Sequence, residues 1–178
     1  MKDSDIADIL TDLALEWEQS GQIISTPQWQ QQALETGAWS YHQHHALIKS
    51  LREAHYDPML IRLVARISDL VELLALLAKR TQPGIGRSGA MSRGNGIGLG
   101  WVKTARGLLV HHIMVENDAV RQYRIIAPTE WNFHPQGALR CALTNWREWA
   151  PSQLRGWVDL QVLGLDPCVQ YQVEIEHA

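Results

Sequence analysis

A run of glycines divides this 178-residue chain into two parts that differ in pattern. Residues 82–100 hold seven glycines in nineteen positions, a composition typical of flexible linkers. Long helical spacing of apolar residues precedes the run, and β-branched, strand-like segments follow it. We therefore expect a helical region over residues 1–81, a glycine-rich linker over 82–100 and a C-terminal region over 101–178. The chain is short enough for all three to form one packed domain.

Apolar spacing and capping residues predict four helices before the glycine run. Their expected ranges are 3–19, 27–37, 40–55 and 58–80. The last follows Asp57, an N-cap residue, and its apolar face is wide enough for a central helix. The residues expected to face inward on it are Leu60, Ile61, Leu63, Val64, Ile67, Leu70, Val71, Leu74 and Leu77.

The C-terminal region mixes strand and helix patterns. Residues 108–115 and 120–126 are β-branched runs separated by an Asn-Asp turn, which predicts an antiparallel hairpin. Helices are expected over 136–149 and again from Pro151, and the alternation over 169–175 is typical of a strand. The fold class expected for the whole chain is α+β, mainly helical, with a small antiparallel β-hairpin after the linker.

Composition excludes several classes of protein. The net charge is −3 and no Lys/Arg run is present, so no nucleic-acid partner is expected. The N-terminus lacks the pattern of a signal peptide, and the longest apolar stretch is too short for a bilayer, so we expect a cytoplasmic protein without membrane insertion. Cys141 and Cys168 lack Cys-x-x-Cys spacing and are expected to be reduced thiols.

Two local patterns are weaker. Residues 84–89 match the dinucleotide pattern Gly-x-Gly-x-x-Gly, but no strand precedes them, which favours a linker. His42, His44 and His45 cluster, and His42 and His45 share a helix face, yet no carboxylate or cysteine lies within a turn of them. A solvated helix face is the favoured interpretation of these histidines, and a metal site is the alternative.

The most specific signal is a set of short motifs in the second half of the chain. Arg106-Gly107 is followed by His111 five residues after the arginine and by Pro128-Thr129 twenty-two residues after it. Trp131-Asn132 and then Asp166-Pro167-Cys168 complete the set. Together these motifs resemble the C-terminal part of a [NiFe]-hydrogenase large subunit, and the resemblance extends from about Gly94 to Cys168. The resemblance implies a fold like that of a truncated large subunit.

The resemblance also implies roles for four residues. An iron ion that carries cyanide and carbon monoxide presents anionic nitrogen atoms, which charged and neutral donors can bind. By resemblance, Arg106 and Thr129 are those donors, Asp166 orients the arginine, and Cys168 is a thiolate ligand of the metal. A weaker similarity lies in residues 62–66, which look like an Arg-x-x-Ala-Arg helix of the same family.

Missing ligands argue against catalysis. Tyr171 stands where the family has its second C-terminal cysteine, and no Cys-x-x-Cys precedes it. One thiolate of four cannot hold a binuclear centre. We therefore expect that the chain is not an enzyme and that it binds no nickel. The pattern is similar to that of the accessory proteins of HupK/HoxV type.

That resemblance implies a maturation scaffold or chaperone for a [NiFe] hydrogenase. Such a scaffold would transiently hold an Fe(CN)2CO fragment before its transfer to the large subunit. The expected partners are that subunit and other maturation proteins. The alternatives are a cofactor-free interaction protein, or a truncated large subunit completed by a partner chain.

Overall fold

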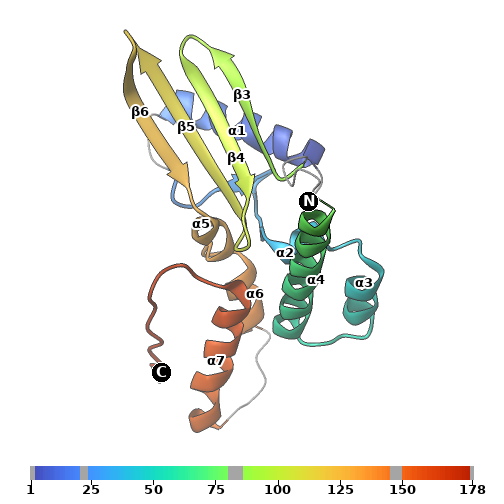
Figure 1. Ribbon diagram of the computed structural model, residues 1–178. Helices are drawn as coiled ribbons and strands as arrows, with labels where there is room; N and C mark the ends of the chain where they lie inside the picture. Colours follow the sequence, from blue (N-terminus) through green and yellow to red (C-terminus); the bar gives the residue numbers. More distant parts are fainter. Residues whose placement is uncertain (1–2, 21–23, 80–85, 145–149, 177–178) are drawn as a thin grey trace.

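The chain forms a sheet covered by one long helix, with a group of helices below it (Figure 1). The computed structural model describes residues 3–20, 24–79, 86–144 and 150–176. Helix α1 (Asp3–Ser20) lies across one face of the sheet, behind it in Figure 1. The α+β class predicted from the sequence is confirmed, but the sheet is larger than the expected hairpin.

The sheet has four antiparallel strands in the order β3-β4-β5-β6. Strands β5 (Leu108–Glu116) and β6 (Ala119–Ile126) form the predicted hairpin, and Asn117 and Asp118 make its turn with positive φ angles. Strands β3 (Ser88–Gly94) and β4 (Ile97–Lys103) occupy residues that we expected to be linker. That expectation is wrong for residues 88–100, and residues 82–85 lie outside the described part of the chain.

The turn between β3 and β4 accounts for part of the glycine content. Asn95 and Gly96 both have positive φ, the conformation of a tight hairpin turn in which Asn-Gly is preferred. A Cβ atom at Gly96 would lie 2.0 Å from the carbonyl oxygen of Val115, so no other residue fits there. At this turn, therefore, glycine allows close strand pairing and does not make a linker.

The main core lies between α1 and the sheet. Strand alternation turns Leu108, Val110 and His112 of β5 toward the helix, and the cross-strand partner of Val110 is Ile126 of β6. Trp131, just after β6, is fully buried in the same cluster. The apolar residues that α1 contributes to this core are Ile6, Ile9, Leu10, Leu13, Ala14 and Trp17.

The segment before α2 (Ala38–Tyr41) differs from the prediction. The helix expected over 27–37 is absent, because β1 (Gln28–Trp29) and β2 (Gln32–Ala33) form a short hairpin instead. Its turn residues Gln30 and Gln31 have positive φ, which a helix cannot accommodate.

The helix expected over 40–55 is divided in the structure. It consists of α2 (Ala38–Tyr41) and α3 (Ala46–Glu53), which are separated by a turn. The imidazole of His45 accepts a hydrogen bond from the Leu47 N–H and caps α3.

The remaining helices agree better with the sequence. Helix α4 (Pro58–Ala78) confirms the fourth predicted helix, and α7 (Pro151–Leu165) begins at the proline as expected. Helices α5 (Pro128–Asn132) and α6 (Ala138–Thr144) are short, and α4 packs against α2, α3 and α7. The prediction of a terminal strand over 169–175 is wrong, since residues 169–176 form no strand.

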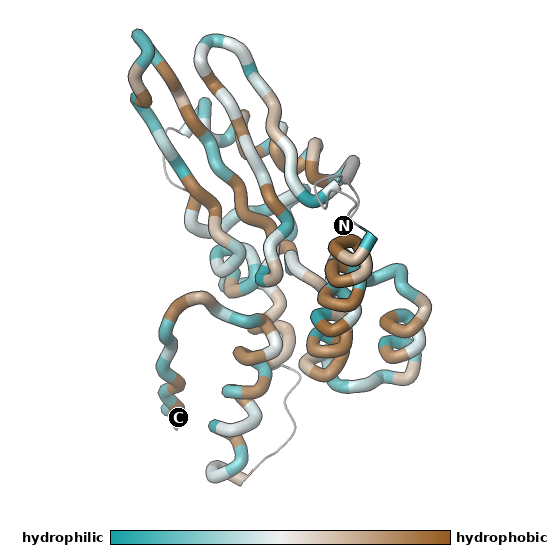
Figure 2. Tube along the Cα trace, viewed as in Figure 1, coloured by the Kyte–Doolittle hydropathy of each residue, from teal (hydrophilic) through white to brown (hydrophobic). Residues whose placement is uncertain are grey.

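Helix α4 buries only part of the face that was predicted to point inward, since Ile61 is buried but the C-terminal part of that face is not. Its fully buried residues are Ile61, Arg62, Ala65 and Asp69. Five residues expected to be inward are instead 55–62% exposed, and Figure 2 shows the apolar character of this helix. They are Ile67, Leu70, Val71, Leu74 and Leu77. No described helix has both the length and the apolar character needed to cross a membrane.

His112 is a buried polar group within the main core. Its ring lies 4.9 Å from that of Trp17, and neither ring nitrogen has a hydrogen-bond partner among the described residues. Burial, together with the nearby positive charge of Arg124, holds the pKa of His112 below its ordinary value. The folded chain therefore favours the neutral imidazole.

This burial predicts a pH dependence of stability. Below about pH 6.5 the unfolded chain takes up a proton at His112 that the folded chain resists. The free energy of unfolding should therefore decrease as the pH is lowered. The His112→Leu variant should lose this component. Urea titrations at about pH 7 and about pH 5 should then show a smaller difference for His112→Leu than for wild type. The exposed-site control His44→Gln should keep the wild-type difference, and an unchanged difference in His112→Leu would contradict the assignment.

Candidate functional site

The buried amide of Asn132 joins three segments that are distant in the sequence. Its Oδ1 accepts a hydrogen bond of 2.8 Å from the backbone N–H of Thr36. Its Nδ2 donates a hydrogen bond of 2.8 Å to the carbonyl oxygen of Arg106. The Thr36 hydroxyl in turn accepts from the N–H of Leu108, at the start of β5. Asn132 thus fixes the turn between β4 and β5 against the end of α5.

Gly107 is required at this junction. It has φ 146°, and a Cβ atom there would lie 2.4 Å from the Thr36 hydroxyl oxygen. The turn is closed by Thr104, whose hydroxyl donates to the Gly107 carbonyl oxygen at 2.8 Å and accepts from the Arg106 N–H at 3.2 Å. The Arg-Gly motif therefore places the Arg106 side chain at one fixed position on the surface.

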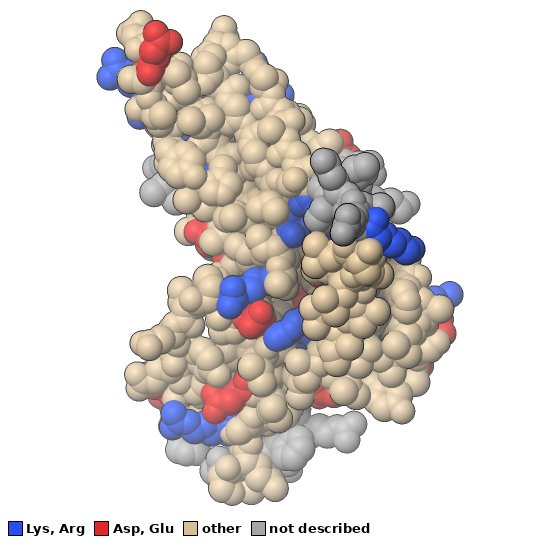
Figure 3. All heavy atoms as spheres, viewed as in Figure 1, with Lys and Arg blue, Asp and Glu red and all other residues tan. Residues whose placement is uncertain are grey.

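Arg106 and Asp166 form an ion pair at that position. The distance from Arg106 Nε to Asp166 Oδ2 is 3.7 Å, and Arg66 Nη2 of α4 lies 3.7 Å from Asp166 Oδ1. Asp166 is the C-terminal cap residue of α7 and has a left-handed backbone with φ 52°. Figure 3 shows basic and acidic side chains side by side in the middle of this face, below the sheet.

Thr129 and Cys168 form the second pair of the site. The Thr129 hydroxyl oxygen lies 3.2 Å from the Cys168 sulfur, although thirty-nine residues separate them. Thr129 is in the first turn of α5, directly after Pro128. Cys168 follows Asp166 by two residues on the exposed segment after α7. The structure therefore brings Arg106 to Asp166 and Thr129 to Cys168.

A small pocket lies beside the Arg106–Asp166 pair. Its polar lining includes Glu35, Arg62, Arg66 and Asn132, together with that pair. Arg62 is bound to Glu35 through two hydrogen bonds, of 2.6 Å from Nε and 2.8 Å from Nη2. Its side chain is only 8% exposed, and Nη1 has no hydrogen-bond partner among the described residues. Both arginines of the Arg-x-x-Ala-Arg helix thus face the site.

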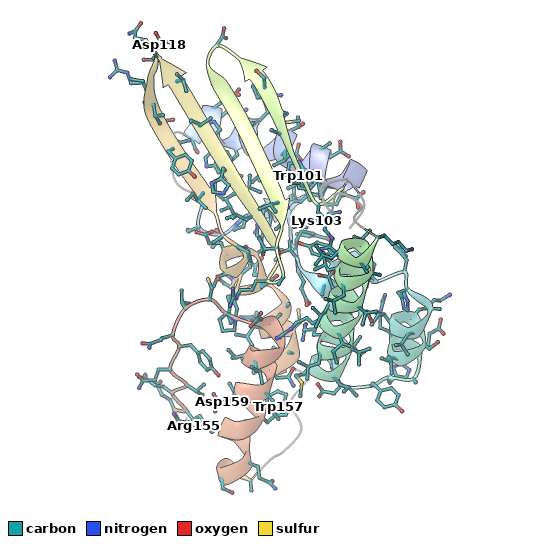
Figure 4. All side chains as sticks on the ribbon, in the orientation of Figure 1. Trp101, Lys103, Asp118, Arg155, Trp157 and Asp159 are labelled. Atoms are coloured by element: carbon teal, nitrogen blue, oxygen red, sulfur yellow. The ribbon has the colours of Figure 1, made fainter. Side chains whose placement is uncertain are left out.

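The site is open to solvent at two of the four residues that the resemblance selected. Half of the Arg106 side chain is exposed, and Cys168 is exposed as well. Tyr171, in place of the missing second cysteine, is also exposed and hydrogen-bonds Asp159 of α7. Asp159 lies on the side of α7 that faces the C-terminal segment (Figure 4). Partial desolvation, together with the charge of Asp159 and this hydrogen bond, raises the pKa of the Tyr171 hydroxyl.

Motif analysis missed two supporting residues. Thr36 and Glu35 belong to no motif, and both lie in the segment for which a helix was expected. Thr36 supports the Gly107 turn, and Glu35 neutralises Arg62. No spacing rule links either residue to Arg106, because their contacts depend on the fold of the segment around β1 and β2.

Comparison with known proteins identifies the relatives of the chain. Residues 65–141 match the nickel-dependent hydrogenase family. The hydrogenase expression/formation protein HoxV of Cupriavidus necator is 33% identical over 177 residues, which cover 94% of this chain and 44% of HoxV. HupK of Azotobacter vinelandii is 40% identical over 88 residues, covering 49% of this chain and 25% of HupK. HupK of Bradyrhizobium diazoefficiens is 30% identical over 148 residues, covering 81% of this chain and 39% of HupK.

These matches confirm the resemblance found in the motifs. The chain is a relative of the HoxV and HupK hydrogenase expression/formation proteins, and its middle part is similar to the nickel-dependent hydrogenase family. It spans less than half the length of these curated relatives.

The Asn132 contacts generate a stability prediction. Asn132→Ala would leave the Thr36 N–H and the Arg106 carbonyl oxygen without their partner, and an unsatisfied buried group costs about 1–3 kcal/mol. We expect the free energy of unfolding to fall by about 2–3 kcal/mol in urea titrations. The control Gln122→Ala, at an exposed position of β6, should change it by less than about 0.5 kcal/mol. Equal stability of the two variants would show that the amide does not hold the junction.

Proposed function

We propose that this relative of HoxV and HupK is a maturation scaffold for a [NiFe] hydrogenase. In this role it transiently holds an iron fragment with cyanide and carbon monoxide ligands, Fe(CN)2CO, before transfer to the large subunit. The observation that carries the proposal is the contact of 3.2 Å between the Thr129 hydroxyl and the Cys168 thiol. A possible metal ligand and a donor for the ligands of that metal therefore lie together.

The donor set fits such a fragment. Cys168 offers one thiolate, and Thr129 beside it offers a neutral hydroxyl donor to a cyanide nitrogen. Arg106 offers a charged donor, held in place by Asp166 two residues before the cysteine. The exposure of Cys168 and Arg106 suits a cargo that must leave again, whereas a resident cofactor is usually enclosed.

The same donor set does not fit a nickel–iron centre. The whole sequence contains two cysteines, and the second, Cys141, belongs to α6. Tyr171, at the place of the bridging cysteine, is engaged with Asp159. With one thiolate at the site, we propose that the chain binds no nickel there and catalyses no reaction of hydrogen. The names of its relatives, which refer to hydrogenase expression and formation, support this accessory role.

A second candidate function is a cofactor-free interaction protein, and the exposed face of α4 favours it. Apolar residues alternate at intervals of three and four along this helix, from Leu60 through Leu70 and Leu74 to Leu77. This spacing is the one with which a helix packs against another helix. A scaffold also needs such a contact. We propose that an apolar helix of a hydrogenase-related protein, either the large subunit or another maturation protein, binds this face.

Substitutions at the candidate site give the decisive test of cargo binding. Cys168→Ser should keep the fold, because the thiol is exposed, and should abolish iron retention, because serine is a poor ligand for low-spin iron. Arg106→Leu should weaken retention without abolishing it. Thr129→Val, which loses one neutral hydrogen bond of about 1 kcal/mol, should have the smallest effect. Iron per chain is measured in protein isolated from the native host, and Cys141→Ser is the matched control.

The outcomes separate the two candidate functions. The scaffold proposal requires the order Cys168, Arg106, Thr129 in loss of iron, with Cys141→Ser at the wild-type level. Hydrogenase maturation in the host should fail with Cys168→Ser. If maturation is unaffected by Cys168→Ser but fails when Leu70 and Leu74 are both replaced by glutamate, the interaction protein is the better description. Equal amounts of nickel and iron in the wild-type protein, both lost in Cys168→Ser, would contradict both candidates.

A further inference from the structure

A second group of possible metal ligands lies away from Cys168, between α2 and α4. His42 is the C-terminal cap residue of α2, and Asp69 and Glu72 lie three residues apart on α4. The His42 Nε2 atom lies 2.9 Å from Asp69 Oδ1 and 3.8 Å from Glu72 Oε2. One ligand atom from each residue lies within 4.8 Å of the other two. The fold thus brings together an imidazole and two carboxylates that sequence spacing kept apart.

The distances suit a small divalent ion. A tetrahedral ion with ligand bonds of about 2.1 Å separates its ligand atoms by about 3.4 Å. The separations from His42 Nε2, which are 2.9 Å to Asp69 Oδ1 and 3.8 Å to Glu72 Oε2, lie on either side of that value. A small ion can therefore fit between these donors after small movements of the side chains. Glu72, whose side chain is 53% exposed, is the ligand with the freedom to make them.

A neighbouring side chain supports one of the donors. The Asp69 carboxylate is almost fully buried and lies within hydrogen-bond distance of both His42 and Arg87. Arg87 donates to both Asp69 oxygens, at 2.5 Å and 3.4 Å, and orients the carboxylate as a partner outside the ligand set. The two carboxylates and Arg87 leave one net negative charge for a cation to neutralise.

The neighbouring residue adds an independent observation. The hydroxyl oxygen of Tyr41 is enclosed and has no hydrogen-bond partner among the described residues. Lys103, labelled at the end of β4 in Figure 4, places its Nζ 5.5 Å from the centre of the Tyr41 ring. A polar group without a protein partner therefore lies beside the cluster.

From these observations we infer that His42, Asp69 and Glu72 form a binding site for one divalent transition-metal ion. An imidazole with two carboxylates suits zinc, cobalt or nickel better than magnesium or calcium, which prefer oxygen ligands alone. Three protein ligands leave at least one position for water or for a ligand atom from another molecule. This site shares no residue with the cargo site at Cys168, so experiments can contradict one of the two proposals and leave the other standing.

Cobalt(II) titration of the purified chain tests the inference. The expected result is one Co²⁺ per chain with visible d–d bands and without the charge-transfer absorption of a thiolate ligand, because no cysteine takes part. His42→Ala and Glu72→Gln should each weaken binding by about tenfold or more, since each removes one of three ligands. Circular dichroism of each variant establishes that it is folded.

Matched controls complete the design. His44→Ala removes an exposed imidazole two residues from His42, and Glu53→Gln removes an exposed carboxylate on α3. Both should bind Co²⁺ as the wild type does, and so should a double Cys141→Ser/Cys168→Ser variant. The inference is overturned if wild-type protein binds no Co²⁺, if folded His42→Ala and Glu72→Gln bind it unchanged, or if the cysteine variant loses it.

Discussion

The amide of Asn132 is the interaction on which the candidate site depends. It joins the segment after β2 to the turn between β4 and β5 through hydrogen bonds to Thr36 and Arg106. Trp131, the residue before it, is fully buried in the core between α1 and the sheet. The end of α5 is thereby fixed to the core on one side and to the Arg106 turn on the other. Thr104 closes the Arg106 turn from within, and the Asn132 junction fixes that turn relative to α5 and to the segment after β2.

The motif residues consequently fall into two groups with different physical tasks. Gly107, Trp131 and Asn132 build the junction, because each fills a position where close approach, burial or a paired amide is needed. Arg106 and Cys168 are exposed and contribute little to packing. A chain can therefore keep the residues that build this junction although Cys168 is the only cysteine among its motif residues.

Local sequence signals predicted the elements whose formation depends on local contacts. Helix α1, helix α4 and the β5–β6 hairpin follow from apolar periodicity, from the Asp57 cap and from an Asn-Asp turn. The Asn95-Gly96 turn was also a hairpin signal, but the surrounding glycines made the segment look like a linker. The prediction of a helix over 27–37 is wrong because Gln30 and Gln31 have positive φ angles. Nothing in the local sequence indicates this conformation.

Tertiary contacts set the remaining differences. Apolar periodicity showed that α4 is amphipathic, but it did not show which face other elements cover. The covered face carries two charged residues, Arg62 and Asp69, which are tolerated there because they form ion pairs with Glu35, His42 and Arg87. The same contacts place His42 beside Asp69, twenty-seven residues away, so a search for ligands within one turn could not find them. Motif spacing did select Arg106, Thr129, Asp166 and Cys168, and the structure forms two contacting pairs from these four residues.

Infrared spectroscopy of the protein isolated from its native host tests the central claim most directly. Cyanide and carbonyl ligands on iron absorb in a region where polypeptide is transparent. If the chain carries the iron fragment at Cys168, cyanide and carbonyl bands should appear together, and they should be missing from the Cys168→Ser protein. A native preparation that supports hydrogenase maturation yet shows neither band would contradict the claim.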